Sequence, residues 1–307
     1  MVASREGGRR LRLRRQRNAP AGTLRPARAP CSPLVTIITA VFNGEDVLEA
    51  TIQSVITQSS QDFEYLIMDG GSADGTLDIL RRYDDALDYW SSEGDEGIYD
   101  AFNKGVRLAG GEWILFLGAG DLLFDRETIQ RAAAGLKSAG SDIQAAYGRV
   151  VRLHADGRFV EEENGPWAAV CDKWRGGRRV MPQHQGIFER RRFLADHVFD
   201  VKYRIVADYK SFAQAIASNP PLYLDCLIAR VTVGGVSSAP RDSLSACLEI
   251  LKLNRELGRG LDHLPHQLFF ALKSAVKTFL SIVLPIRGAM KIVDVYRKLT
   301  GRRKMWT

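Results

Sequence analysis

Strand-like and helix-like segments alternate through the first half of the chain, and this order strongly limits the possible fold. A β-branched apolar run at 34–41 precedes an amphipathic stripe over 46–58, and the apolar runs at 64–69 and 112–118 also alternate with helical patterns. Strands that are apolar along their whole length are typical of a sheet covered on both faces. The alternation therefore predicts an α/β fold with a doubly wound, mostly parallel sheet and flanking helices.

The folded part divides into this regular half, 34–125, and a less regular half, 126–260. In the second half we expect a hairpin over 143–162, a short strand and a helix within 184–196, a helix over 207–218, a strand over 222–235 and a helix over 243–257. No segment repeats another, which argues against a solenoid or a propeller.

Positive charge is concentrated at the two ends of the chain. Residues 1–30 and 265–307 each carry a net charge of +8, so the total of +7 leaves about −9 for the segment between them. An acidic middle without a nucleic-acid-binding module argues against nucleic acid as a partner. Residues 1–33 are rich in Arg, Pro, Ala and Gly without periodicity, which predicts a disordered basic tail. An organelle transit peptide is the alternative, and the lack of an apolar run argues against a secretory signal.

Residues 261–307 predict a basic amphipathic helical tail. Its apolar side chains share one helical stripe: Phe269, Leu272, Val276, Phe279, Leu280 and Val283. The uncharged run over 278–286 is far too short to span a bilayer, whereas basic amphipathic helices bind membrane surfaces. A helix packed on the protein itself or on another subunit is the alternative. Because the four cysteines are far apart, without a C-x-x-C pair, a reducing compartment is favoured. We therefore expect a cytoplasmic protein, peripheral at the inner face of a membrane.

Polar side chains follow the predicted parallel strands where ligands bind in such sheets, at the carboxyl ends. The first strand ends at Thr39–Asn43, the second at Asp69 in "MDGGSADGT", and the third in "GAGD" at Asp121. Two acids and an amide at one edge suit Mg²⁺ or Mn²⁺, which prefer oxygen ligands. The glycines after Asp69 would let a base or ribose approach closely. An Asx-turn or helix cap is an equal alternative for this acid.

Two further stretches have weaker signals. "GAGDLL" begins like the dinucleotide fingerprint G-x-G-x-x-G, but Leu123 replaces the third glycine, so a nicotinamide-dependent enzyme is disfavoured. "DEGIYDAFNKG" (95–105) surrounds a helix start with acids, and its Lys104 could offset a diphosphate charge. A solvated helix lysine is the alternative for that residue.

Together, "VTIITAVFNGEDVLEATIQSVITQSSQDFEYLIMDGGSADGT" and "DEGIYDAFNKGVRLAGGEWILFLGAGD" resemble the donor half of a family 2 glycosyltransferase with the GT-A fold. The resemblance is strong over 34–123 and looser to about 233. It implies inverting transfer of a sugar from a nucleotide-diphosphate sugar to a hydroxyl, with Mg²⁺ or Mn²⁺. On this reading 34–125 binds the nucleotide sugar and 126–260 binds the acceptor.

The resemblance also implies roles for individual residues. The nucleotide-sugar-binding positions are Thr39, Val41, Asn43, Asp69, Gly70, Gly71, Asn103 and Lys104. Asp121 is the implied metal ligand. The sequence departs from the family here, because Gly120 stands where many relatives have a second acid and Gly118 where an Asn is frequent. One carboxylate suffices if the diphosphate and waters complete an octahedron.

The second half resembles the acceptor side of the same family through "MPQHQGIFERRRFL" and "KYRIVADYKSF". Asp208 matches the general base, which takes the proton of the acceptor hydroxyl. A first-turn helix acid is the alternative. His184 and Gln185 are implied to bind acceptor or phosphate, although a lone histidine is more often structural.

Two functions are therefore weighed. The first is a glycosyltransferase in polysaccharide or glycolipid biosynthesis, acting on a glycan or lipid-linked acceptor. The second is a catalytically degenerate nucleotide-sugar-binding protein, suggested by the glycine beside Asp121.

Overall fold

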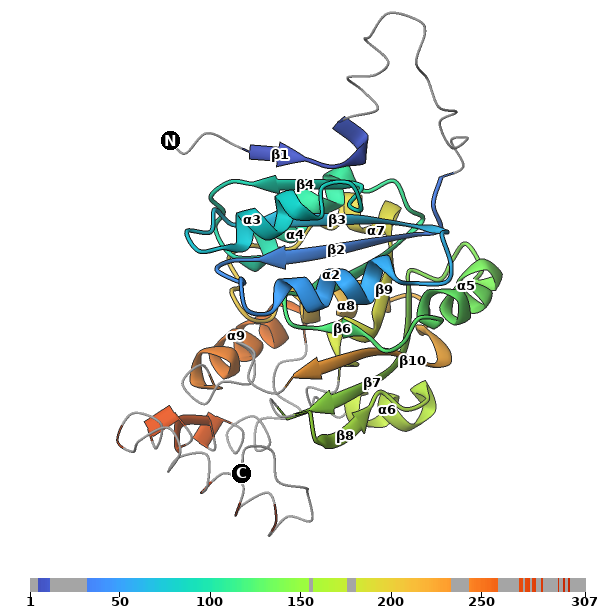
Figure 1. Cartoon of the computed structure of the whole chain (residues 1–307). Coiled ribbons are helices and arrows are strands. Elements are labelled where there is room, and N and C mark those ends of the chain that lie inside the picture. The colour runs from blue at the N-terminus through green and yellow to red at the C-terminus, as the bar shows by residue number, and fades with distance from the viewer. Residues whose placement is uncertain are drawn as a thin grey trace, which may run out of the picture.

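The computed structural model describes residues 5–11, 32–154, 157–175, 181–232 and 243–258, with single helical positions between 271 and 298. These residues form an α/β fold in which helices flank one large sheet (Figure 1). The predicted fold class is confirmed.

The regular half alternates strands and helices as expected. Its elements are β2 (Val35–Val41), α2 (Leu48–Ile56), β3 (Phe63–Asp69), α3 (Thr76–Arg82), β4 (Tyr89–Ser92), α4 (Ile98–Leu108), β5 (Trp113–Gly118) and β6 (Leu122–Leu123).

The remaining elements include the expected hairpin, strand and helices. They are α5 (Thr128–Ser138), β7 (Ala145–Leu153), β8 (Phe159–Glu163), α6 (Trp167–Arg175), the 3₁₀ turn η1 (His184–Gly186), β9 (Ile187–Arg190), α7 (Arg191–Asp196), α8 (Ala207–Ala215), β10 (Leu222–Thr232) and α9 (Ser243–Glu256). β7 and β8 pair antiparallel, as the hairpin prediction requires.

One sheet joins the two halves of the chain. Its strand order is β1-β4-β3-β2-β5-β9-β7-β10-β6, with β8 paired to β7 outside this path. The strands from β4 through β5 are parallel, whereas β9 pairs antiparallel with both β5 and β7. The sheet is therefore parallel from β4 through β5 and mixed beyond β5.

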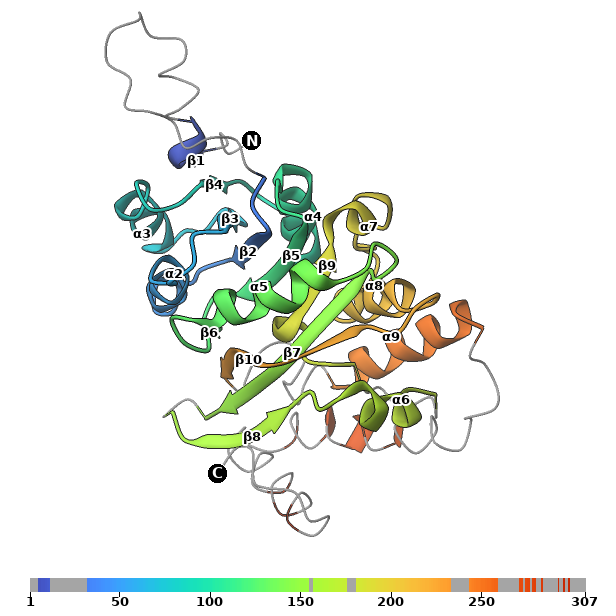
Figure 2. The ribbon, with the colours of Figure 1, turned by 90° about the vertical axis from the view of Figure 1, so that its right-hand side faces the viewer.

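Side chains of the central strands alternate between two cores. Ile37 of β2 and Leu115 of β5 belong to the core that α2, α3 and α5 cover, while Ile38 and Phe116 belong to the core under α4, α7, α8 and α9. Figure 2 shows these helix groups on opposite faces of the sheet. The alternation follows from the two-residue period of a strand, and it explains why these strands read as continuous apolar runs.

The extreme N-terminal part differs from the expected disordered tail over residues 5–11. Here β1 (Arg5–Gly7) pairs antiparallel with β4, and the backbone N–H of Gly8 donates to Asp84 Oδ1 over 2.6 Å. Arg10 also forms an ion pair with Glu64. The added strand covers the free edge of β4, which would otherwise expose unpaired backbone groups.

Much of the predicted C-terminal tail over 261–307 lies outside the described residues. Where the structure does describe it, positions 271, 272, 274–276, 278, 279 and 283 are helical. Within the described part of the chain, no helix combines the length and apolar character needed to cross a membrane.

Gly105 lets α4 lie directly against β2. A Cβ at this position would stand 2.6 Å from Cγ2 of the buried Ile38. Helix propensity favours alanine over glycine by about 1 kcal/mol, but overpacking a core costs roughly 1–3 kcal/mol. We expect Gly105→Ala to lower the free energy of unfolding by about 1 kcal/mol, measured by urea denaturation.

Gly94→Ala is the matched control, because a Cβ there meets nothing within 4 Å. Its unfolding free energy should stay within about 0.5 kcal/mol of the wild type. A Gly105→Ala variant more stable than the wild type would show that helix propensity outweighs the contact with Ile38.

Candidate active site

The carboxyl ends of three neighbouring strands lie level at one edge of the sheet. Asp69 of β3 is the register partner of Val41 in β2, and Ala40 of β2 is the partner of Gly118 in β5. Adjacent strands are about 4.8 Å apart. The turns after β2, β3 and β5 are therefore neighbours, as the sequence predicts for a ligand-binding edge.

Asp69 organises the glycine turn that follows it. Its carboxylate is buried and accepts hydrogen bonds from the Ser72 backbone N–H at 3.1 Å and the Ser92 hydroxyl at 2.6 Å. The Ser72 hydroxyl also donates to this carboxylate. The side chain of Asp69 thus closes the local turn through a backbone N–H three residues further along the chain.

Glycine suits positions 70 and 71 of this turn for two different structural reasons. Gly71 takes a φ of +85°, which an L side chain rarely adopts. Gly70 donates its N–H to the Val41 carbonyl, and a Cβ on it would stand 2.7 Å from Oδ2 of Asp95. Gly71 therefore permits the left-handed backbone of the turn, and Gly70 leaves room for the Asp95 carboxylate.

Asn43 lies in the turn after β2 and is hydrogen-bonded to the glycine turn after β3. It has a φ of +49°. Its N–H donates to Ser72 Oγ at 2.7 Å, and its Oδ1 accepts from the Ala73 N–H at 3.0 Å. The residue is exposed, so it lies at the rim of the strand-end site.

Thr39 and Val41, which are predicted to bind the nucleotide sugar, have side chains that are packed inside the protein. Both are buried, and Thr39 Oγ1 is hydrogen-bonded to the Tyr65 hydroxyl at 3.0 Å. Val41 belongs to the core beneath α2 and α3. The physical reason is strand alternation, since odd-numbered side chains of β2 point into that core.

Asn103, which is predicted to lie near the ribose or diphosphate, has its side-chain amide engaged within the protein. It is buried, and its amide brackets Phe199, donating to the backbone carbonyl at 2.8 Å and accepting from the N–H at 2.9 Å. Since one side-chain amide saturates both backbone groups of Phe199, α4 is fastened to the segment before α8. Sequence alone could not pair residues so far apart.

Lys104 stabilises the turn before α4. Its ammonium donates to the Gly94 carbonyl at 3.0 Å and forms ion pairs of 3.2 Å with both Glu93 and Asp100. The Glu93 N–H in turn donates to the backbone carbonyl of Asp69. The cation therefore lies close to the glycine turn, but acidic partners already surround it.

Asp121 is a partly buried carboxylate at the end of β5. Its Oδ2 accepts from the Gln185 amide at 3.0 Å and from the Gly118 N–H at 3.2 Å. Burial raises the pKa of Asp121 to about 6, and these two hydrogen bonds counter only part of that effect. The site thus presents a carboxylate whose negative charge is poorly compensated by the protein.

Asp208 is held between two elements of the second core. Its Oδ1 accepts from the Tyr99 hydroxyl at 2.9 Å and from the Tyr209 N–H at 2.8 Å. Its Oδ2 lies 3.9 Å from Nδ1 of His184. Asp208 lies in the first turn of α8. Its carboxylate also contacts Tyr99 of α4 and lies near His184 of η1.

The turn η1 connects the two acids. Gln185 contacts Asp121, and its neighbour His184 lies beside Asp208. The His184 ring stacks on Phe116 at 5.2 Å. Burial lowers the pKa of His184, which favours a neutral imidazole. Within the described residues, its Nε2 is buried and has no hydrogen-bond partner.

Two residues that lie near Asp208, namely Tyr99 and Glu189, were not identified from the sequence. Tyr99 stands inside the quoted "DEGIYDAFNKG", but its contact spans 109 residues. Glu189 of β9 is buried, accepts from the Ser211 hydroxyl at 2.7 Å and has a pKa raised by burial to about 8. An acid inside the apolar strand "GIFER" was the available signal.

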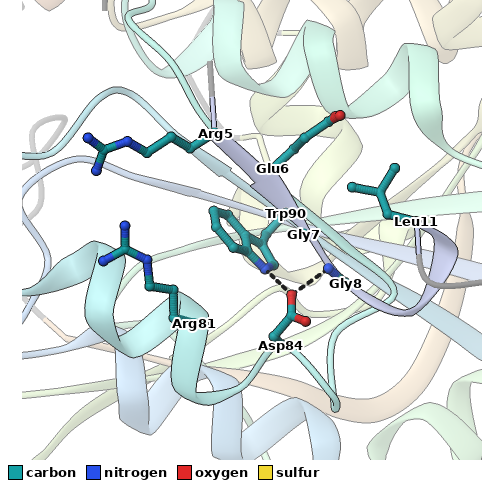
Figure 3. A pocket seen from close by; sticks show the side chains of 8 residues that line it. All are labelled: Arg5, Glu6, Gly7, Gly8, Leu11, Arg81, Asp84 and Trp90. Carbon is teal, nitrogen blue, oxygen red and sulfur yellow. Dashed lines mark hydrogen bonds between the residues drawn. The ribbon is translucent and has the colours of Figure 1, made fainter. Parts of the chain in front are cut away.

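A pocket of about 490 Å³ lies away from these residues, beside β1 and β4 (Figure 3). Arg5, Arg81, Asp84 and Trp90 are among the residues that line it. Asp84 is already engaged, since its Oδ1 accepts from the Trp90 indole N–H at 2.7 Å and from the Gly8 N–H. This hollow contains none of the predicted site residues.

The residues at the end of β5 fit a single divalent cation. Among the described residues, no group of three or more His, Cys, Asp and Glu could hold a metal without help from a ligand. Mg²⁺ commonly binds through one or two carboxylates together with substrate phosphates. The partly buried carboxylate of Asp121 suits that mode, whereas the described residues form no all-protein metal cage.

The protein has an α/β fold in which polar residues gather at the carboxyl ends of parallel strands, as in the GT-A fold. Comparisons with known proteins agree with this fold. The family model for glycosyl transferase family 2 matches residues 36–190. The chain is 34% identical to a PGL/p-HBAD biosynthesis glycosyltransferase of Mycobacterium tuberculosis, over 74% of this chain and 87% of that protein.

Two solved structures share the fold at low sequence identity. One is S. aureus TarS 1–349 in complex with UDP-GlcNAc, with 17% identity, a TM-score of 0.53 and coverage of 86% and 77% of the two chains. The other is the mannosyltransferase PcManGT from Pyrobaculum calidifontis in complex with GDP-Man and Mn²⁺, with 16% identity, a TM-score of 0.56 and coverage of 94% and 86%. A longer TarS chain is matched over 43% of its length.

The chain belongs to glycosyltransferase family 2 and is a glycosyltransferase. The resemblance predicted from its strand-end motifs is thereby confirmed.

Glu189 gives a test of the buried electrostatics. Its pKa is about 8 in the folded protein, against an ordinary value of 4.5. Between these values the folded state keeps a proton that the unfolded state has lost, so this group lowers stability as pH rises, by about 1.4 kcal/mol per pH unit. Glutamine cannot ionise. We expect the stability of Glu189→Gln, relative to wild type, to rise by about 3 kcal/mol between pH 5 and pH 8 in urea unfolding.

Glu127→Gln serves as the control, because this glutamate is exposed on the surface. Its stability difference from the wild type should not change with pH by more than about 0.5 kcal/mol. An equally flat difference for Glu189→Gln would contradict the assignment of a neutral buried acid.

Proposed function

We propose that the protein transfers a sugar from a nucleotide-diphosphate sugar to a hydroxyl of a glycan or lipid-linked acceptor, with inversion at the anomeric carbon. The observation that carries this proposal is the turn η1. Its adjacent residues Gln185 and His184 lie against Asp121 and Asp208, the implied diphosphate-side acid and general base. Family membership and the named relatives support the donor class.

The donor is proposed to lie along the ends of β2, β3 and β5. There Asn43 is exposed at the rim, and Gly70 and Gly71 add no side chain to the turn after β3. The two solved structures of this fold hold UDP-GlcNAc and GDP-Man. For Asp69, Thr39, Val41 and Asn103 we propose indirect roles, because their side chains are engaged within the protein.

Asp121 would hold Mg²⁺ or Mn²⁺ together with the donor diphosphate, and the chemistry such a cation supplies is compensation of charge on the leaving diphosphate. Asp208 would accept the proton of the acceptor hydroxyl while that oxygen forms its bond to the anomeric carbon. The bond from the anomeric carbon to the diphosphate oxygen breaks in the same displacement, so a single step inverts the configuration. Burial lowers the pKa of His184 and so favours its neutral form. A neutral imidazole carries no charge to pair with the Asp208 carboxylate.

Single substitutions separate the two acids. We expect Asp121→Asn to weaken Mn²⁺-dependent donor binding at least tenfold in calorimetry, because the amide cannot supply the charge. Asp208→Asn should bind the donor normally and lose transfer by about 10²–10⁴-fold, the usual contribution of a general base. A screen of nucleotide sugars with Mn²⁺ identifies the donor beforehand.

Asp196→Asn is the control for both variants, since Asp196 is exposed at the end of α7. Full transfer by Asp208→Asn would overturn the base assignment. A wild-type protein that binds donor but transfers to no glycan or lipid-linked acceptor would favour the degenerate binding protein.

We also propose that the protein works peripherally at the cytoplasmic face of a membrane. In the C-terminal segment Leu272, Val276, Phe279 and Val283 are between 50% and 65% exposed. Two polar residues of this segment face the protein: Ser274 is buried, and Thr278 Oγ1 accepts from the Leu244 N–H at 3.2 Å. An outward apolar stripe within a segment of net charge +8 suits an anionic lipid surface.

Vesicle flotation tests this location. The full chain should float with phosphatidylglycerol vesicles, float poorly with phosphatidylcholine vesicles and detach in high salt. Phe279→Ser should reduce flotation about tenfold, while Phe159→Ser, which changes an exposed phenylalanine on β8, should not. Equal flotation of both variants, or a Phe279-dependent dimer in light scattering without flotation, would contradict the membrane proposal.

A further inference from the structure

Helix α4 contacts both sides of the candidate site. At its start, the Glu93 N–H donates to the Asp69 carbonyl, and Lys104 of α4 donates to the Gly94 carbonyl. Asp95, in the same turn, lies against Gly70. The turn before α4 is thus fixed to the glycine turn at the donor edge.

The same helix is fastened to the segment that carries Asp208. Asn103 brackets the backbone of Phe199, and the rings of Tyr99 and Phe199 are 5.5 Å apart. Tyr99 is buried, and its hydroxyl donates to Asp208 Oδ1 at 2.9 Å. Donor-side and acceptor-side groups therefore share one rigid element.

Tyr99 is distinguished from the other ionisable residues around Asp208 by its hydrogen bond to the carboxylate. The ionisable groups that face this carboxylate are Tyr99 from α4, His184 from η1 and Glu189 from β9. Glu189 is buried and accepts from the Ser211 hydroxyl at 2.7 Å, and its raised pKa favours the neutral acid. His184 is 3.9 Å away, beyond normal hydrogen-bond length. Within the described residues, the Tyr99 hydroxyl is the side-chain group that donates a hydrogen bond to Asp208. The backbone N–H of Tyr209 donates to the same carboxylate oxygen.

We propose that Tyr99 is a positioning residue for the transfer step, which fixes the Asp208 carboxylate so that one oxygen is directed to the acceptor hydroxyl. With Oδ1 held by Tyr99 and by the Tyr209 N–H, Oδ2 is the oxygen left to accept a proton. A carboxylate held by two donors cannot rotate freely, and small displacements of a general base reduce its contribution strongly. This inference rests on the proposed role of Asp208 as the base.

The experiment is Tyr99→Phe, which removes one oxygen and keeps the ring beside Phe199. We expect kcat to fall about tenfold, equivalent to about 1.4 kcal/mol, while donor KM and calorimetric donor affinity stay within twofold of the wild type. Loss of packing alone would instead change the melting temperature and KM together. Tyr99→Leu, which removes the ring as well, should lower both kcat and stability.

Tyr89→Phe is the matched control, because the Tyr89 hydroxyl donates to Glu6 Oε2 at 2.7 Å, on the β1 side of the sheet. It should leave kcat unchanged. Full kcat in Tyr99→Phe, with Asp208→Asn inactive, would overturn the positioning role and leave the base assignment intact. If Asp208→Asn itself retains transfer, the proposed function fails first and the role of Tyr99 fails with it.

Discussion

Burial of β2 on both faces, with β3 and β5 paired in register on its two sides, is the constraint on which the site depends. Two helical layers must cover a strand whose side chains are apolar in both directions. Once they do, the turns after the three strands emerge at the same level. The polar edge is a consequence of packing the core.

The second half of the chain completes the site by inserting η1 and β9 next to β5. β9 pairs antiparallel with β5, so the residues just before it arrive at the carboxyl end of β5. This reversal of direction brings Gln185 to Asp121 and His184 to Asp208. Two acids from distant segments are thereby connected through two consecutive residues.

Several polar residues that look like ligand contacts in the sequence are engaged inside the protein. Asp69 accepts from the Ser72 N–H, Asn103 is hydrogen-bonded to both backbone groups of Phe199, and Thr39 is hydrogen-bonded to Tyr65. Buried polar groups need partners, because an unsatisfied donor or acceptor costs roughly 1–3 kcal/mol. At this site, polar side chains largely set the backbone shape, and the chemistry that we propose is assigned to Asp121 and Asp208.

The sequence by itself determined the strand–helix alternation, the parallel part of the sheet and the strand-end positions of Asp69 and Asp121, because these follow from local periodicity and from the rule that parallel strands end at one edge. It also placed Asp208 at the start of a helix. Only the tertiary structure decided which side chains are already bonded, that β1 covers the edge of β4, and that Tyr99 and His184 reach Asp208. Those contacts join segments up to 109 residues apart, and their geometry arises from packing in three dimensions, which no short-range pattern encodes.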